Sequence, residues 1–422
     1  MNALNSTGKL PSGLPKAKPE EVGFSSERLA RMGPAMQKYI DARMVPGVLT
    51  VVVRHGRIVH FQCQGMMDIE AKKPVLDDTI FRIMSMTKPI VSVALMMLYE
   101  EGYFLLDDPI SRYLPPFKQM MVRGKHGSIV PANREITFRD CLTHTAGFSN
   151  EESTRISSRF SAGPRPGQPL IPGAAGQVIN QPAQQGTIEE TVELLARAPL
   201  NCQPGTDWEY FADHTVLGVL IEKISGQKLD AFLQKRILDP LQMSDTHFYL
   251  PQEKAGRLAA GYAFARNEWG MFGLLDSPAT SSKVLGPKTY LSPGGGLLST
   301  AGDYARFAQM MLNGGALDGA RIIGRKTIDL MTTSHTGGLE IPKGPGYGFG
   351  LLGFVRLNLA DAQIVGTPGT YGWGGVFCTS YFADPKEDLF GLQFSQVLNA
   401  AQNPLLTIRK DLERMVYLTF PP

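Results

Sequence analysis

The sequence predicts an α+β protein with a mixed antiparallel sheet, flanking helices and an inserted, mostly helical lobe. Strand-like segments lie near both ends of the chain, whereas helical periodicity dominates its middle. A chain of 422 residues is also longer than one compact core usually holds, so two lobes are expected. We therefore expect an N-terminal arm over residues 1–24, an α/β domain built from 25–84 and 290–422, and a helical domain over 85–289.

The first elements are expected to be a helix and a β-hairpin. Ser25 suits the N-cap of a helix that continues to about Ala42. The run Val48–Arg54 is rich in β-branched residues, His55-Gly56 favours a tight turn, and Ile58–Gln62 fits the returning strand.

Helical periodicity begins after residue 85. Apolar residues recur there at the spacing of a helix that buries one face: Ile90, Val93, Ala94, Met97 and Leu98. The same period marks Ile188–Ala198, Val216–Ile224 and Leu229–Ile237. Toward the end we expect a helix at about Ala301–Asn313, strands at Gly350–Arg356, Val376–Ala383 and Leu389–Gln396, and a last helix near Asn403–Tyr417.

Residues 149–186 are rich in Ser, Gly, Pro and Gln and are expected to form a long loop. Loops of this length are either functional or mobile. A surface excursion is the preferred interpretation, and a wall of the substrate cleft is the alternative.

The composition argues against several classes of function. The net charge is only +3 and no Lys/Arg run is dense, so neither nucleic acid nor a membrane is an expected partner. The longest apolar run, Ile90–Tyr99, is far shorter than the roughly 20 residues that span a bilayer. The first twenty residues lack the apolar stretch of a secretory signal, so a cytoplasmic location is expected. The four cysteines are widely spaced and no His-Glu-x-x-His pattern occurs, so neither a metal nor a cofactor is expected.

The pattern Ser-x-x-Lys occurs at three places: Ser6…Lys9, Ser85…Lys88 and Ser225…Lys228. Only Ser85 follows an extended apolar stretch and opens a helix, on which Lys88 lies one turn further along the same face. A helix N-terminus favours developing negative charge, and a desolvated lysine can activate a serine hydroxyl. Taken alone, the pattern also fits a serine N-cap followed by a surface lysine.

Several further motifs occur in a fixed order along the chain: Phe81–Pro89, Leu105–Pro109 with Tyr113-Leu114-Pro115, Ile136–Gly147, Pro204–Tyr210 leading into Val216-Leu217-Gly218, Pro240–Met243 and Gly294–Thr300. In these motifs the sequence resembles class C β-lactamases, penicillin-binding proteins and their esterase relatives, the family VIII carboxylesterases. The resemblance covers roughly residues 25–415.

The resemblance implies roles for particular residues. Ser85 corresponds to the acylated nucleophile, Lys88 to its activating partner, and Tyr210 to the proton-shuttling tyrosine of a Tyr-x-Asn element. A core aromatic after a Pro-Gly turn is the alternative for Tyr210. The backbone amides of Ser85 and Val376 are implied to form the oxyanion hole.

Trp373-Gly374-Gly375 corresponds to a substrate-binding element that reads Lys-Thr-Gly in β-lactamases and commonly Trp-Gly-Gly in family VIII esterases. A plain turn before a strand is the alternative. Two departures from the β-lactamase pattern stand out: Ala212 replaces the Asn of Tyr-x-Asn, and Trp373 with Gly374 offers neither cation nor hydroxyl. Both losses disfavour efficient cleavage of β-lactams or peptides.

Two histidines, His144 and His214, could belong to a Ser-His-Asp triad, but a Lys/Tyr pair makes such a triad unnecessary. Structural hydrogen bonding is the preferred interpretation of both.

The sequence therefore predicts a serine carboxylesterase that hydrolyses short-chain neutral carboxylic esters through an acyl-Ser85 intermediate, with weak cephalosporin hydrolysis as an accompanying activity. A small-molecule ester is the expected partner. The alternatives on the same scaffold are a β-lactamase or D-amino-acid peptidase, and an acyltransferase. An alternative of another class is a non-catalytic, penicillin-binding-like module.

Overall fold

The computed structural model describes residues 13–124, 127–149, 186–210, 212–267, 270–278, 284–398 and 407–421. Its main sheet is built from β1 Gly47–Arg54, β2 Arg57–Asp68, β3 Lys73–Pro74, β12 Tyr347–Phe349, β13 Phe354–Arg356, β14 Tyr371–Gly375, β15 Thr379–Asp384 and β16 Leu389–Phe394. These strands form an antiparallel sheet of order β12-β13-β14-β15-β16-β1-β2-β3. Segments from both ends of the chain thus build one sheet, joined where β1 pairs with β16, as the sequence predicts.

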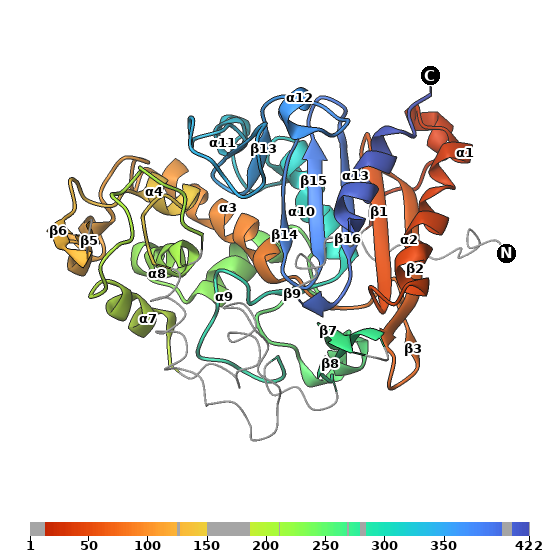
Figure 1. The fold of residues 1–422 in the computed structure, drawn as a ribbon, viewed down its shortest axis with the longest axis horizontal. Helices are drawn as coiled ribbons and strands as arrows, with labels where there is room; N and C mark the ends of the chain where they lie inside the picture. Colours follow the sequence, from red (N-terminus) through yellow and green to blue (C-terminus); the bar gives the residue numbers. More distant parts are fainter. Residues whose placement is uncertain are drawn as a thin grey trace.

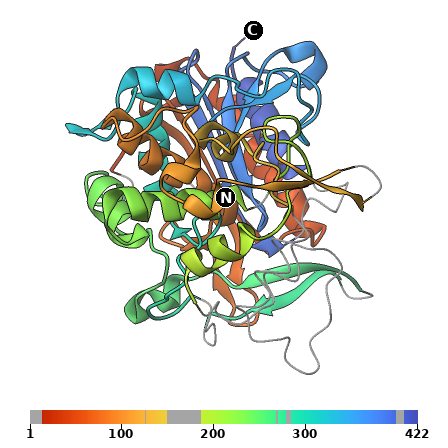
Figure 2. The ribbon, with the colours of Figure 1, turned by 90° about the vertical axis from the view of Figure 1, so that its left-hand side faces the viewer.

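Helices cover both sides of this sheet. Their bounds are α1 Ser26–Leu29, α2 Met32–Asp41, α3 Thr87–Glu100, α4 Phe138–Thr143, α7 Ile188–Leu195, α8 Asp213–Ser225, α9 Leu229–Leu233, α10 Ala301–Leu312, α11 Arg325–Met331, α12 Leu359–Ala362 and α13 Ile408–Tyr417. Helices α1, α2 and α13 lie on one side of the sheet, and α3, α4, α8 and α9 lie on the other (Figure 1). Figure 2 shows the molecule from the side of the second group, with the sheet behind it.

Strand β1 is buried on both faces, which explains its continuous apolar sequence. Successive side chains of a strand point to opposite faces. Val48 and Val52 belong to the core shared with α2 and α13, whereas Leu49, Val51 and Val53 belong to the core that contains α3 and α10. The sheet is therefore the partition between two hydrophobic cores.

The middle of the chain is mostly helical but also contains strands. One hairpin pairs β5 Met121–Arg123 with β6 Ile129–Pro131, and another pairs β7 Gly261–Asn267 with β8 Gly270–Asp276. The short strand β17 Val397–Leu398 adds to β7 in parallel. The end of the predicted helical segment is thereby tied to the C-terminal part of the chain.

Two strand predictions need correction. The segment Gly350–Arg356 is not one strand, because it begins in the turn between β12 and β13. The predicted strand Val376–Ala383 begins three residues later, at Thr379, because a turn follows Gly375. Cys378 closes that turn with a left-handed φ of 63°.

The predicted loop over residues 149–186 lies almost wholly outside the described residues, so neither interpretation of it is tested. Among the described helices, none is both long and apolar enough to cross a membrane.

A buried ion pair fastens α13 to the sheet. Arg356 of β13 donates to the Glu413 carboxylate of α13, and their side chains are 0% and 6% exposed. Removing one partner of such a pair leaves an uncompensated buried charge.

We therefore expect Glu413→Ala to lower the free energy of unfolding by about 3–5 kcal/mol. Urea denaturation followed by circular dichroism measures this loss. The matched control is Glu27→Ala, which removes a carboxylate from an ion pair whose side chains are 63% and 83% exposed, and should cost less than about 1 kcal/mol. Equal losses of unfolding free energy in the two variants would contradict the role of the Arg356–Glu413 pair in stabilising the fold.

Candidate active site

Ser85 lies in a short 3₁₀ turn, η2 (Met84–Met86), which runs directly into α3. The residue before it, Met84, has a φ of 50°, in the left-handed region that side chains rarely adopt. Such a conformation costs on the order of 1–3 kcal/mol and persists only where the surroundings enforce it. Ser85 thus stands at the start of α3, as predicted, but it is reached through a strained turn.

Three hydrogen bonds hold this turn in place. The Ile83 carbonyl accepts from the Thr379 hydroxyl at 3.2 Å, and the Ile83 amide donates to the Leu297 carbonyl at 3.2 Å. The Tyr304 hydroxyl donates to the Met86 carbonyl at 3.1 Å. The sheet, the segment before α10 and α10 itself therefore fix the backbone on both sides of Ser85.

The ammonium group of Lys88 reaches Ser85 from the first turn of α3. Its Nζ donates to the Gly294 carbonyl at 2.6 Å and to Ser85 Oγ at 3.3 Å. Lys88 is only 5% exposed, so the interpretation of this residue as a surface lysine is wrong. Burial of a charge costs free energy unless the charge is paired or hydrogen-bonded. The Gly294 carbonyl and Ser85 Oγ therefore stabilise the buried ammonium group.

Tyr210 brings a second hydroxyl to the serine. Its OH lies 2.8 Å from Ser85 Oγ, and its ring centroid lies 4.7 Å from Lys88 Nζ. The segment that carries it is tied to the end of α4, because the Glu209 amide donates to the His144 carbonyl at 2.8 Å. The sequence-based choice of Tyr210 over other tyrosines therefore agrees with its position.

These groups give Ser85 Oγ two neighbours that can accept and return a proton. A serine hydroxyl becomes a useful nucleophile only when a neighbouring base takes its proton, and a general base must lie within hydrogen-bond reach. Ala212, which stands where the resembled families have Asn, is buried and adds no polar side chain. Lys88 and Tyr210 are thus the groups that the described residues place within hydrogen-bond reach of this serine; their role in proton transfer stays a prediction.

An aromatic wall stands beside Tyr210. Trp373, on β14, lies with its ring centroid 5.6 Å from that of Tyr210 and 5.1 Å from that of Phe349. Trp208 also stacks on Tyr210, with ring centroids 5.6 Å apart and planes inclined by only 7°. The wall is apolar and uncharged, as the sequence departure at Trp373 predicts.

The glycines after Trp373 allow β14 to approach the turn that carries Ser85. A Cβ on Gly375 would collide with the Ile83 carbonyl and would stand 3.1 Å from Met84 Cβ. Val376 follows Gly375 in the turn after β14 and packs with Met84 on the same small cluster. This neighbourhood is compatible with the predicted oxyanion role of the Ser85 and Val376 amides, which stays a prediction.

A cation that the sequence argument missed lies next to this strand. Arg409 of α13 donates from Nη2 to the Gly375 carbonyl, and its Nη1 would stand 3.0 Å from a Cβ on Gly374. It belongs to another helix, so no local motif around Trp373 could have indicated it.

The two histidines make structural hydrogen bonds, in line with the preferred interpretation. His144 Nδ1 lies 2.8 Å from Asp213 Oδ2, and His214 Nε2 lies 3.2 Å from the hydroxyl of Ser92. Ser92 is fully buried, so it cannot meet a substrate. Burial lowers the pKa of both imidazoles.

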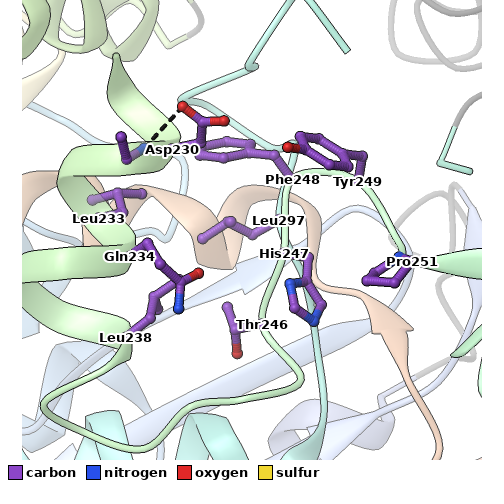
Figure 3. A pocket seen from close by; sticks show the side chains of 11 residues that line it. Asp230, Leu233, Gln234, Leu238, Thr246, His247, Phe248, Tyr249, Pro251 and Leu297 are labelled. Atoms are coloured by element: carbon purple, nitrogen blue, oxygen red, sulfur yellow. Dashed lines mark hydrogen bonds between the residues drawn. The ribbon is translucent and has the colours of Figure 1, made fainter. Parts of the chain in front are cut away.

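A separate cavity of about 240 Å³ lies between α9 and the segment 246–251 (Figure 3). Leu233, Phe248 and Leu297 are among its lining residues, and Ser85, Lys88 and Tyr210 are not. It is therefore distinct from the site around Ser85.

Comparisons with known proteins agree with this geometry. The family model described as Beta-lactamase matches residues 35–412, and the chain belongs to this family. The protein is accordingly a serine hydrolase of β-lactamase type, with an α+β fold of the β-lactamase and transpeptidase kind.

Its relatives cover nearly the whole chain. Esterase EstB of Burkholderia gladioli is 30% identical over 400 residues, which cover 90% of this chain and 93% of the relative. Protein Rv1367c of Mycobacterium tuberculosis is 32% identical over 377 residues, covering 86% and 88%. Among solved structures, EstCE1, described as a hydrolase with promiscuous acyltransferase activity, superposes with a TM-score of 0.72 at 26% identity, covering 92% of this chain and 98% of that one.

We expect Ser85→Ala to abolish hydrolysis of p-nitrophenyl esters, because no other described hydroxyl contacts both Lys88 and Tyr210. Steady-state assays of the folded variant measure the loss. Ser225→Ala is the matched control, since Ser225 also belongs to a Ser-x-x-Lys pattern but donates to the Ile221 carbonyl at a helix end. Ser6→Ala serves as a second control, and both should retain wild-type rates. Turnover close to wild type in Ser85→Ala would end this assignment.

Removing either proton-transferring group should slow catalysis while the protein stays folded. Lys88→Ala and Tyr210→Phe are each expected to lower kcat by about 10²–10⁴-fold, the usual range for general acid–base groups. The double variant should lose less than the product of the two factors, because the groups act on one oxygen as a unit. Fully multiplicative losses would show that they act independently.

Proposed function

We propose that this protein is a carboxylesterase that hydrolyses short-chain neutral esters through an acyl-Ser85 intermediate. The observation that carries the proposal is the aromatic, uncharged residue Trp373 beside Tyr210, where β-lactamases have the cation of Lys-Thr-Gly. An indole offers a large apolar surface to a neutral acyl or alcohol group. The similarity to EstB, a protein named as an esterase, supports the same substrate class.

In the proposed mechanism, the Tyr210–Lys88 pair, once it has lost one proton to solvent, takes the proton of Ser85 Oγ as that oxygen attacks the ester carbonyl. The amides of Ser85 and Val376 stabilise the oxyanion, because backbone donors aimed at developing charge lower the barrier. The same Tyr210–Lys88 pair returns a proton to the leaving alcohol. Water then attacks the acyl-enzyme with the pair acting as base, and free Ser85 is regenerated.

Weak cephalosporin hydrolysis is the second candidate activity. Ser85, Lys88 and Tyr210 support it, because esters and β-lactams are acylated by the same set of groups. Ala212 argues against efficient β-lactam cleavage, since it provides no polar anchor for an amide side chain.

We expect kcat/KM for p-nitrophenyl butyrate to exceed that for a chromogenic cephalosporin, with penicillins poorest. A charge-assisted hydrogen bond contributes roughly 1.5–3 kcal/mol, or about one to two orders of magnitude in kcat/KM. Trp373→Lys should therefore shift the ratio toward the cephalosporin by about tenfold or more. The measurement is kcat/KM for p-nitrophenyl butyrate and for the chromogenic cephalosporin on both proteins.

A companion substitution tests the neighbouring position. Adding Gly374→Thr should lower stability as well, because a Cβ there would stand 3.0 Å from both the Thr379 carbonyl and Arg409 Nη1. A wild-type protein that prefers the cephalosporin would overturn the esterase proposal in favour of a β-lactamase.

A further inference from the structure

A histidine and a carboxylate lie buried behind Tyr210, and the proposed mechanism uses neither. His144 and Asp213 are each 0% exposed and are joined by their 2.8 Å hydrogen bond. Two of their atoms, His144 Nε2 and Asp213 Oδ1, are buried without a hydrogen-bond partner among the described residues. Unsatisfied buried polar groups are costly and rare, so this pair calls for a functional explanation.

The histidine of this pair contacts the tyrosine directly. The imidazole of His144 packs on the phenol ring of Tyr210, with centroids 4.7 Å apart and planes inclined by 56°. The His144 carbonyl also accepts from the Glu209 amide, next to Tyr210 in sequence. His144 itself is fixed as the C-cap of α4, with a left-handed φ of 59°. Both its ring and its backbone therefore set the position of Tyr210.

The carboxylate of Asp213 complements the charge of Lys88. Both hydrogen-bond acceptors of the Lys88 ammonium, the Gly294 carbonyl and Ser85 Oγ, are neutral groups. Burial raises the pKa of Asp213, whereas the charges of His144 and Lys88 and the hydrogen bond from His144 lower it. Burial outweighs the other contributions, so the pKa of Asp213 is raised on balance, and the charge of Lys88 opposes that rise. A Cβ on Gly294 would stand 3.2 Å from Lys88 Nζ and 3.9 Å from the Cβ of His214, so the start of α8, where Asp213 lies, is next to the ammonium group.

The other titratable groups near the pair are Cys141 and His214, Asp140, which is ion-paired with Arg134 at 2.6 Å, and Glu209, which accepts from the Asn201 side-chain amide at 3.2 Å. Burial raises the pKa of the Cys141 thiol well above its usual value and lowers that of His214 well below. Among the described residues, Asp213 differs from Asp140 in having no Arg or Lys side chain within ion-pair distance, which leaves its carboxylate to balance the charge of Lys88.

We propose that His144 and Asp213 are positioning residues for the proton-transferring pair: His144 holds the phenol of Tyr210 over Ser85, and the Asp213 carboxylate balances the ammonium charge of Lys88. This inference rests on the proposed roles of Tyr210 and Lys88, but not on the identity of the ester substrate.

The test uses the rate at which an alkyl fluorophosphonate labels the full-length protein, read by intact mass between pH 5 and 10. In this reaction Ser85 Oγ forms a bond to phosphorus, the P–F bond breaks, fluoride leaves, and the serine proton passes to the Tyr210–Lys88 pair. A wild-type protein that is labelled at Ser85 but hydrolyses no ester would refute the proposed esterase function and leave this test intact.

Asp213→Asn keeps the shape of the side chain and removes its charge. A carboxylate favours the protonated state of nearby groups, so without it the proton-transferring pair should lose its proton at lower pH. The acid limb of the labelling profile is therefore expected to move down by about one pH unit. Asp384→Asn is the matched control, because Asp384 is also fully buried but bonds Tyr417 outside the site. An acid limb that coincides with that of the wild type would overturn the charge-balancing role.

His144→Asn tests the positioning role, and it carries the test if Asp213→Asn does not fold. Asparagine tolerates the left-handed backbone at this position but removes the ring from Tyr210. The labelling rate should fall about 10–100-fold in the Tyr210 background, as expected for a misplaced catalytic group, and by less than threefold in the Tyr210→Phe background. Equal losses in both backgrounds would mean that His144 acts only on general stability, and the proposal would fail.

Discussion

Burial of the Lys88 ammonium group is the constraint on which the rest of the site depends. A charge taken out of water needs acceptors at close range, and the chain provides them as the Gly294 carbonyl and Ser85 Oγ. This requirement brings the Gly294-Gly295-Gly296 turn against the start of α3. The turn must be built of small residues, since a Cβ on Gly296 would stand 2.8 Å from the Ser292 carbonyl. The nucleophile, its base and a distant glycine turn are therefore one structural unit.

The sheet supplies the rigidity that this unit needs. Met84 adopts a left-handed conformation that an isolated turn would abandon. Thr379, at the start of β15, and Gly375, at the end of β14, enclose the turn from the sheet side. Because these contacts come from the paired strands β14 and β15, the sheet rather than a flexible loop holds the turn that carries Ser85.

The sequence predicts some parts of this arrangement and not others, for physical reasons. Ser85 and Lys88 are neighbours within one helical turn, so local periodicity is enough to pair them. Tyr210 and Trp373 are joined to Ser85 only through tertiary contacts, so their selection required a resemblance to a known family. The sequence places Trp373-Gly374-Gly375 ahead of a strand, because glycine has poor β-propensity. In the structure these residues are the end of β14, where Trp373 pairs with Tyr381 in a regular ladder.

Buried partners were harder still to foresee. A backbone carbonyl such as that of Gly294 has no sequence signature, and Arg409 lies on a separate helix. The His144–Asp213 pair joins the end of one helix to the start of another. Neither the pattern of charges nor the spacing of residues in the sequence indicates which buried acid contacts which histidine. That contact depends on how α4 packs against α8.

The pairing of β1 with β16 has a consequence for how the chain reaches its native state. Leu49 pairs with Phe394, so the central ladder of the sheet cannot close until almost the whole polypeptide has left the ribosome. Contacts this distant in sequence carry a loop-closure cost and slow folding. Until then the hairpin of β1 and β2 exposes the edge that β16 will cover, an apolar run of Val48–Val53 with unpaired amides and carbonyls. During synthesis this nascent edge is the segment most exposed to aggregation, and the one that a chaperone would have to shield.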